Sequence, residues 1–164
     1  MSHVAAVDAR EEPAGAGTPE LRLWVRLLRC AKIGEKQLRR SFEDQFDTTL
    51  PRFDVMAALH REPGGLSMGR LSRALLVSNG NVTSIVRQLQ AQGLVVSRPD
   101  PQDGRSAIVS LTLEGETQFK ALAEAHHRWI AKIFAMCLPH RSSSWCKGLA
   151  ICERSWGTII EYCL

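Results

Sequence analysis

Long apolar runs are missing from this 164-residue sequence, and no stretch approaches the roughly 20 residues that cross a bilayer as a helix. The N-terminal segment, MSHVAAVDAREEPAGAGTPE, is small and acidic, so it also lacks the basic start and apolar stretch of a secretory signal. We therefore expect a cytoplasmic protein with no membrane partner, in which residues 1–17 form a flexible leader.

Paired cysteines and clustered metal ligands are missing as well. The five cysteines are an odd number and include no C-x-x-C pair, which argues against a disulfide framework and against a zinc site. The neighbouring His126 and His127 have no further ligands at metal spacing, so we expect them in the core or on a helix surface. The sequence predicts free thiols, no metal and no cofactor.

Familiar catalytic motifs are absent too. The sequence has no G-x-S-x-G elbow, P-loop, dinucleotide fingerprint or H-E-x-x-H motif. We therefore expect a protein that is not an enzyme.

Lysine is absent between residues 61 and 110, although the chain carries a formal net charge of +4. The basic residues of this segment are all arginines, namely Arg61, Arg70, Arg73, Arg87, Arg98 and Arg105. Arginine presents a planar fork of donors that suits phosphates and guanine edges, whereas lysine is a point charge. This bias and the modest positive charge are compatible with nucleic-acid binding but do not require it.

The residues that are present indicate one globular, mostly helical subunit, since 45% of them are hydrophobic. Thr18, followed by Pro19 and Glu20, is a typical helix start. Apolar residues then recur at helical spacing, at Leu21, Trp24, Leu28, Ala31, Leu38, Phe42 and Phe46. The first half of this helix is apolar on more than one face, and we interpret the surplus as a surface covered by a second chain.

Three shorter helices are predicted next. One begins at Pro51 and ends before the EPGG turn at 62–65. Ser67 caps a second, and Ser78 caps a third that runs to Gln92. The second and third helices are joined by a tight turn, which is the pattern of a helix-turn-helix.

Two strands, Leu94–Arg98 and Ser106–Leu111, flank the polar loop PDPQDG, and Thr112 then caps a long helix that Pro139 ends. The apolar stripe of that helix consists of Phe119, Leu122, His126, Trp129, Ile133 and Cys137. Residues 138–164 have weaker periodicity. They are either a divergent helix that packs on a partner's first helix or a segment altered by a reading-frame change, and both interpretations stay open.

This order of elements is the layout of a winged helix-turn-helix, a mainly α fold of the α+β class with a small antiparallel β-hairpin. An α-helix is about 10–12 Å across and fits a major groove of about the same width, so the helix at 78–92 can read base edges there. The hairpin beside it, which we call the wing, can reach the neighbouring minor groove or backbone. The sequence therefore predicts double-stranded DNA as a partner.

The segment 50–115 resembles the MarR family of bacterial transcriptional regulators, and the resemblance extends over most of residues 18–138. It is carried by LPRFDVMAAL and by LSMGRLSRALLVSNGNVTSIVRQLQAQGLVVSRPDPQDGRSAIVSLTLEG. The family's wing typically reads D-x-R-D-x-R and continues into V-x-L-T-x-x-G. The matching residues are Asp100, Asp103, Arg105, Val109, Leu111, Thr112 and Gly115. The middle arginine of the pattern is Gln102 here, which removes the cation that the family has at that place.

The resemblance implies an obligate homodimer that binds an inverted-repeat operator and represses transcription. It divides the chain into the leader (1–17), an N-terminal dimerisation helix (18–48), a DNA-binding domain (49–112) and C-terminal dimerisation helices (113–164). It also implies a small-molecule or oxidant cue that is sensed between the lobes. The string SNGNVT resembles a subgroup that regulates aromatic-acid catabolism, including hydroxycinnamates recognised as CoA thioesters.

Contacts to DNA are predicted first in the helix at 78–92, the recognition helix. Ser78 and Asn79 lie at its N-terminus, where backbone N–H groups favour a phosphate. We assign Asn81 and Thr83 to base edges, and Arg87 to base or backbone. The competing interpretation is a solvated polar helix face with an ordinary cap.

The wing supplies the second set of predicted contacts. Arg105 reaches the groove, Asp100 and Asp103 hold the loop, and Arg98 lies near phosphates. The competing interpretation is a charged hairpin turn that only adds solubility.

An effector pocket follows from the resemblance alone, with Trp24, Arg40, Phe42, Phe53 and Trp129 as candidate lining residues. The competing interpretation places the aromatic residues in the core or in a dimer interface. Arg40 would then be half of an exposed basic pair with Arg39.

Cys30 is a candidate redox sensor, because some relatives sense oxidants through one thiol and three basic residues, Arg26, Arg29 and Lys32, lie nearby. We instead predict that Cys30 and Cys137 are buried, apolar cysteines. Two alternative functions remain open, a thiol-based oxidant-sensing repressor and a winged-helix module that binds proteins.

Overall fold

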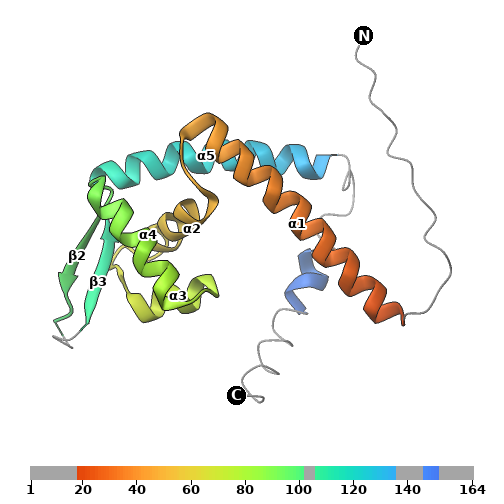
Figure 1. The fold of residues 1–164 in the computed structure, drawn as a ribbon, viewed down its shortest axis with the longest axis horizontal. Coiled ribbons are helices and arrows are strands. Elements are labelled where there is room, and N and C mark those ends of the chain that lie inside the picture. The colour runs from red at the N-terminus through yellow and green to blue at the C-terminus, as the bar shows by residue number, and fades with distance from the viewer. Residues whose placement is uncertain (1–17, 102–105, 136–145, 152–164) are drawn as a thin grey trace, which may run out of the picture. The chain divides into compact units, whose positions relative to one another are not determined.

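The computed structural model describes residues 18–101, 106–135 and 146–151 (Figure 1). The chain divides into two compact units, Met1–Lys36 and Gln37–Leu164. Within the described residues, no helix is long and apolar enough to cross a membrane.

The first helix, α1 (Pro19–Phe46), begins as the sequence predicts. The backbone N–H of Leu21 donates to Oγ1 of Thr18 at 3.4 Å, so Thr18 is the N-cap. A hydrogen bond from Thr18 lowers the pKa of the exposed Glu20 carboxyl. Farther along the same helix, Leu38 and Phe42 are buried in the core of the second unit.

Most large apolar residues in the described part of the first unit, residues 18–36, are exposed. Their exposed fractions are at least 38%: Leu21, Leu23, Trp24, Val25, Leu28 and Ile33. The sequence predicted apolar residues on more than one face of this segment. In the structure these apolar side chains are exposed.

The helices α2 (Leu50–His60), α3 (Met68–Leu75) and α4 (Asn79–Ala91) form a group in which each packs against the other two (Figure 1). Their apolar faces make the core. Val82, Val86 and Leu89 are buried on α4, and Leu71 is buried on α3. Burial of each such side chain contributes about 1.5–3 kcal/mol, which outweighs the weak intrinsic helix preference of α4, a glycine- and asparagine-containing segment.

A small antiparallel sheet lies beside these helices, in the order β1-β3-β2. The two predicted strands are β2 (Val95–Pro99) and β3 (Ala107–Leu111). Both are present, and Leu66–Ser67 forms a short third strand, β1, that the sequence analysis did not predict. Two residues are too few to show the alternation by which a strand is recognised in a sequence.

Gly65 makes the close approach of β1 to β3 possible. Its φ of +84° is accessible to glycine, and a Cβ there would lie 2.7 Å from the carbonyl oxygen of Val109. The second glycine of the EPGG turn therefore admits the third strand.

The last long helix, α5 (Leu113–Ala135), starts at the cap that the sequence predicts. The N–H of Gly115 donates to Oγ1 of Thr112 at 3.0 Å, and the Thr112 hydroxyl donates to the carbonyl oxygen of Gly93 at 2.7 Å. These bonds tie the start of α5 to the end of α4. Phe119, Leu122 and Trp129 are buried as predicted.

The C-terminal predictions fall largely outside the described residues. Cys137 and Pro139 lie there, and so do most of residues 138–164. The described part of that segment, residues 146–151, is helical.

Candidate nucleic-acid interface

The turn between α3 and α4 is set by a single residue in the left-handed conformation. Leu76 has φ 54° and ψ 38°, and its N–H donates to the carbonyl oxygen of Arg73 at 3.2 Å. The N–H of Val77 donates to the carbonyl oxygen of Ser72, also at 3.2 Å. These two hydrogen bonds end α3 and fix the direction in which the chain enters α4. The helix-turn-helix that the sequence predicts is therefore confirmed.

The polar residues of the recognition helix α4 lie on its exposed side. Ser78, Asn79, Asn81 and Arg87 are exposed, while the buried apolar face holds the helix against the core. Thr83 is half-buried, and its hydroxyl donates to the carbonyl oxygen of Asn79 at 2.8 Å. Ser78, Asn79, Asn81 and Thr83 thus lie at the first turns of this helix, and Arg87 lies about one turn beyond Thr83.

One detail of the helix start differs from the sequence prediction. Ser78 occupies the N-cap with an extended backbone, but its side chain makes no capping hydrogen bond. The predicted N-cap position is therefore confirmed, without the side-chain hydrogen bond that such a cap usually makes. The hydroxyl of Ser78 remains available beside the N–H groups of the first turn, and these groups are where an anion is favoured.

The wing is a regular hairpin up to its tip. Its outermost paired residues are Pro99 and Ala107, and the N–H of Asp100 donates to the carbonyl oxygen of Ser106 at 3.0 Å. The Ser106 hydroxyl donates to Oδ2 of Asp100 at 3.2 Å, so Asp100 holds the base of the loop. Asp103 and Arg105, like Gln102, lie outside the described residues.

Arg98 has a partner that the sequence did not reveal. Its Nη2 donates to the carbonyl oxygen of Gly64 at 2.8 Å, which links β2 of the wing to the turn before β1. The guanidinium is exposed and has four further N–H groups that can donate to a phosphate.

Three of the candidate effector residues pack against one another in the core of the second unit. The ring centroid of Phe42 lies 4.9 Å from that of Phe53 and 4.9 Å from that of Trp129. All three are at least 92% buried, so direct packing occupies the space between their rings. Arg40 is exposed, and Trp24 belongs to the other compact unit and is 48% exposed.

His126 lies within this aromatic cluster. Its ring centroid is 4.7 Å from that of Phe53 and 6.1 Å from that of Phe42. Burial, and to a smaller degree the neighbouring His127, lower the pKa of His126. The structure therefore places the half-buried ring of His126 against the aromatic residues of the core, near the first of the two positions that the sequence left open.

The prediction that Cys30 is buried is wrong. The residue is a free, exposed cysteine on α1, because no described residue of the first unit covers it. Among the described residues, no group of three or more His, Cys, Asp or Glu side chains is placed to hold a metal ion.

Two groupings were missed by the sequence reasoning. Nδ1 of His60 at the end of α2 lies 2.7 Å from Oε2 of Glu116 in α5. A pocket between α2 and α3 gathers Arg61, Arg70 and Arg73. The run of arginines without lysine pointed to this part of the chain, but only the packing of α2 on α3 brings these three residues together.

A recognition helix reached through a tight turn, with a three-stranded sheet and its hairpin beside it, defines a winged helix-turn-helix protein. A model of the MarR family matches residues 46–106. A MarR family transcriptional regulator from Silicibacter pomeroyi is 35% identical in sequence. Its structure covers 85% of this chain and 94% of its own length, with a TM-score of 0.68. The chain belongs to the MarR family.

Two further proteins are similar to this chain. The transcriptional activatory protein BadR from Rhodopseudomonas palustris is 35% identical over 121 residues, which cover 73% of this chain and 65% of BadR, slightly less than two thirds. The transcriptional regulator BldR from Sulfolobus solfataricus shares the fold, with a TM-score of 0.74 at 22% identity, covering 82% of this chain and 95% of BldR. MarR family proteins are DNA-binding transcriptional regulators, so this chain is a transcriptional regulator and not an enzyme.

Proposed function

We propose that this chain acts as a homodimeric, cytoplasmic repressor that binds an inverted-repeat operator and is released from it by a small molecule. The observation that carries the proposal is the exposed polar start of α4, which is set beside a hairpin wing. In this arrangement two recognition helices of a dimer enter successive major grooves, about 34–36 Å apart on centres.

The roles of individual residues follow from their chemistry and exposure. Asn81 and Thr83 read base edges in the major groove, since an asparagine side chain can bond an adenine with two hydrogen bonds. Ser78 and Asn79 hold a phosphate at the helix start, and Arg87 contacts base or backbone. In the wing, Arg105 enters the minor groove while Arg98 contacts phosphate.

The dimer is supported by the apolar residues of α1 that no described part of the first unit covers. Exposed apolar patches of this kind mark surfaces that associate. We propose that the partner chain's first and last helices cover them, which divides the chain into the dimerisation segments 18–48 and 113–164 and the DNA-binding domain 49–112.

The effector that fits the resemblance is a small aromatic acid or its CoA thioester. An effector acts here by differential binding, because it favours a dimer whose recognition helices are wrongly spaced for the operator. Trp24, Arg40, Phe42, Phe53 and Trp129 remain the proposed lining. Since three of these side chains are close-packed, a ligand would have to separate them.

Footprinting on the DNA upstream of the gene tests the proposal. The expected result is protection of an inverted repeat, which an aromatic acid or its CoA ester relieves. Protection without any relief would exclude an effector of that class, and an absence of protection at low ionic strength would overturn the proposal. BadR is called an activator, so a transcription assay on the same fragment should accompany the footprint, and higher transcription with the protein would overturn repression.

A second candidate function is favoured by the exposure of Cys30, since a thiol that senses oxidants must be accessible. In this case, peroxide would release the protein from its operator and Cys30→Ser would abolish that release. Cys146→Ser, which alters another exposed cysteine, is the matched control. Equal responses of wild type and Cys30→Ser to peroxide would remove this candidate.

A further inference from the structure

Leu76, in the turn between α3 and α4, has a backbone conformation that is unusual for its residue type. Its φ of 54° and ψ of 38° lie in the left-handed region. The three other described residues with a positive φ are Gly65, Gly93 and Asp47. Glycine adopts this region readily and aspartate is enriched in it, whereas a bulky apolar residue there is an outlier. Leu76 therefore costs the fold stability that a glycine would not cost.

The side chain of Leu76 does not offset this cost by packing in the core. It is 93% exposed, which is the largest exposed fraction among the large apolar side chains that the structure describes. A leucine in water at a strained position contributes neither to packing nor to solubility. Strained residues of this kind cluster at sites that bind a ligand or a partner.

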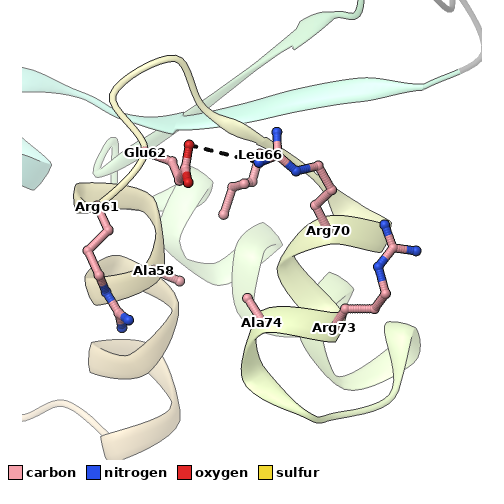
Figure 2. Close-up of a pocket in the computed structure, with 7 residues that line it drawn as sticks. All are labelled: Ala58, Arg61, Glu62, Leu66, Arg70, Arg73 and Ala74. Carbon is pink, nitrogen blue, oxygen red and sulfur yellow. Dashed lines mark ion pairs between the residues drawn. The ribbon is translucent and has the colours of Figure 1, made fainter. Parts of the chain in front are cut away.

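The turn holds Leu76 in a fixed place. In the last turn of α3, Ala74 faces α2 while Arg73 extends from the other side of the helix (Figure 2). The N–H groups of Leu76 and Val77 donate to carbonyl oxygens of this turn, those of Arg73 and Ser72, both at 3.2 Å. Because the backbone is already ordered, covering the leucine side chain costs little further conformational entropy.

Leu76 lies next to the polar start of the recognition helix. Ser78, two residues later, is the N-cap of α4, and the exposed Asn79 and Asn81 follow in the first turn. Two residues of chain span at most about 7 Å, so a duplex that contacts Ser78 is within reach of the leucine side chain. In the major groove the apolar feature of the base edges is the C5-methyl group of thymine.

We propose that Leu76 is a specificity-determining residue of this regulator, and that its side chain packs on the C5-methyl group of a thymine in the operator. The inference rests on the proposed insertion of α4 into the major groove and adds to it an apolar contact from the turn. The polar side chains of α4 read hydrogen-bonding groups, whereas Leu76 reads a group that forms no hydrogen bond. The stability lost to the left-handed leucine fits this role, since functional sites often reduce stability.

Replacement of thymine by deoxyuridine tests the contact, because uracil keeps the hydrogen-bonding groups of thymine and lacks only the methyl group. The probe is the upstream DNA fragment that the full chain protects in the footprint, with each thymine of one half-site replaced in turn. The affinity of wild type, measured by gel-shift titration, should fall about fourfold at one thymine. This is the loss expected when one carbon-sized apolar group is no longer buried.

Leu76→Asn replaces the leucine by a polar side chain of similar size. It should bind the unsubstituted fragment at least about fourfold more weakly than wild type and show no further loss at the sensitive thymine. Leu113→Asn is the matched control, because Leu113 is 87% exposed at the start of α5. This control should bind the fragment and respond to deoxyuridine like wild type.

The stability of the free protein separates a role in binding from a structural role. Asparagine and glycine tolerate the left-handed region better than leucine does. Leu76→Asn and Leu76→Gly should therefore unfold at a urea concentration equal to or above that of wild type, although both bind the fragment more weakly. Lower urea midpoints in both variants would assign Leu76 to the support of the turn and overturn the proposal.

The remaining outcomes decide against the inference or against the proposed function. Weaker binding by Leu76→Asn without a sensitive thymine in wild type would place the leucine on the sugar-phosphate backbone and refute the thymine contact. Wild-type affinity and a wild-type deoxyuridine response in Leu76→Asn would refute the inference alone. A wild-type protein that protects no DNA would refute the proposed function and the inference with it.

Discussion

Nη2 of Arg98 donates to the carbonyl oxygen of Gly64 across 2.8 Å, and this bond joins the wing to the turn that precedes β1. The wing is also attached to the domain by the pairing of β3 with β1 and by the packing of β2 and β3 against the neighbouring helices. The guanidinium is therefore oriented by the fold before any DNA arrives, which lowers the ordering cost of a phosphate contact.

Replacing Arg98 by Gln should weaken operator binding and also change its salt dependence. Loss of one phosphate contact lowers the slope of log affinity against log salt by about 1, because one fewer counterion is released. Binding measured at four or more salt concentrations gives the slope. An unchanged slope with weaker binding would show that Arg98 only braces the wing.

Asn81→Ala should reduce operator affinity by about 1–3 kcal/mol, the usual value of one good base contact. The variant should also lose discrimination at one base pair of each half-site. Gln45→Ala on α1 removes a similar exposed amide outside the recognition helix and serves as the control. Equal losses on operator and random DNA would mean that Asn81 contacts the backbone instead.

Trp24→Glu should dissociate the dimer, because the exposed indole on α1 would otherwise be buried against the partner. We expect the dimer dissociation constant, measured by analytical ultracentrifugation, to rise at least about tenfold. Val96→Glu changes another exposed apolar residue, on β2, and should leave the dimer intact. A dimer of wild-type stability in Trp24→Glu would place the interface elsewhere.

Gly115→Ala should destabilise the fold by about 3 kcal/mol, near the upper end of overpacking costs. The new Cβ would lie 2.0 Å from the carbonyl oxygen of Leu94, a backbone atom that cannot rotate away. Gly69→Ala on α3 meets nothing within 4 Å and should instead be neutral or stabilise by about 0.5–1 kcal/mol. Urea unfolding at equal protein concentrations compares the two, and equal effects would contradict the contact at Gly115.

Acid should destabilise the protein through His126. Its pKa is lowered in the folded state by burial, so the unfolded chain binds a proton at a higher pH than the folded chain does. Stability is then lost as the pH falls below about 6.5, the ordinary value of a histidine. His126→Phe, which keeps an aromatic ring against Phe53, should flatten the urea midpoint between pH 7 and pH 5. A variant with the wild-type acid slope would assign that slope to other groups.

Local signals in the chain were sufficient to predict most elements of the DNA-binding domain. Thr112 as the cap of α5 and Ser67 as the cap of α3 could be recognised because each cap acts within three residues. The strand Leu66–Ser67 could not, because it depends on a partner more than 40 residues away. The exposure of Cys30 could not either, since burial depends on which helix faces find partners.

By itself the sequence determined the helices, the helix-turn-helix and the wing, because periodicity, caps and turn residues act over short stretches of chain. Only the tertiary structure decided that Phe42, Phe53 and Trp129 close-pack, that Arg98 is held by Gly64, and that arginines of α2 and α3 share one pocket. Each of these facts depends on which surfaces meet when the elements pack, and that choice is made by the free energy of the whole core.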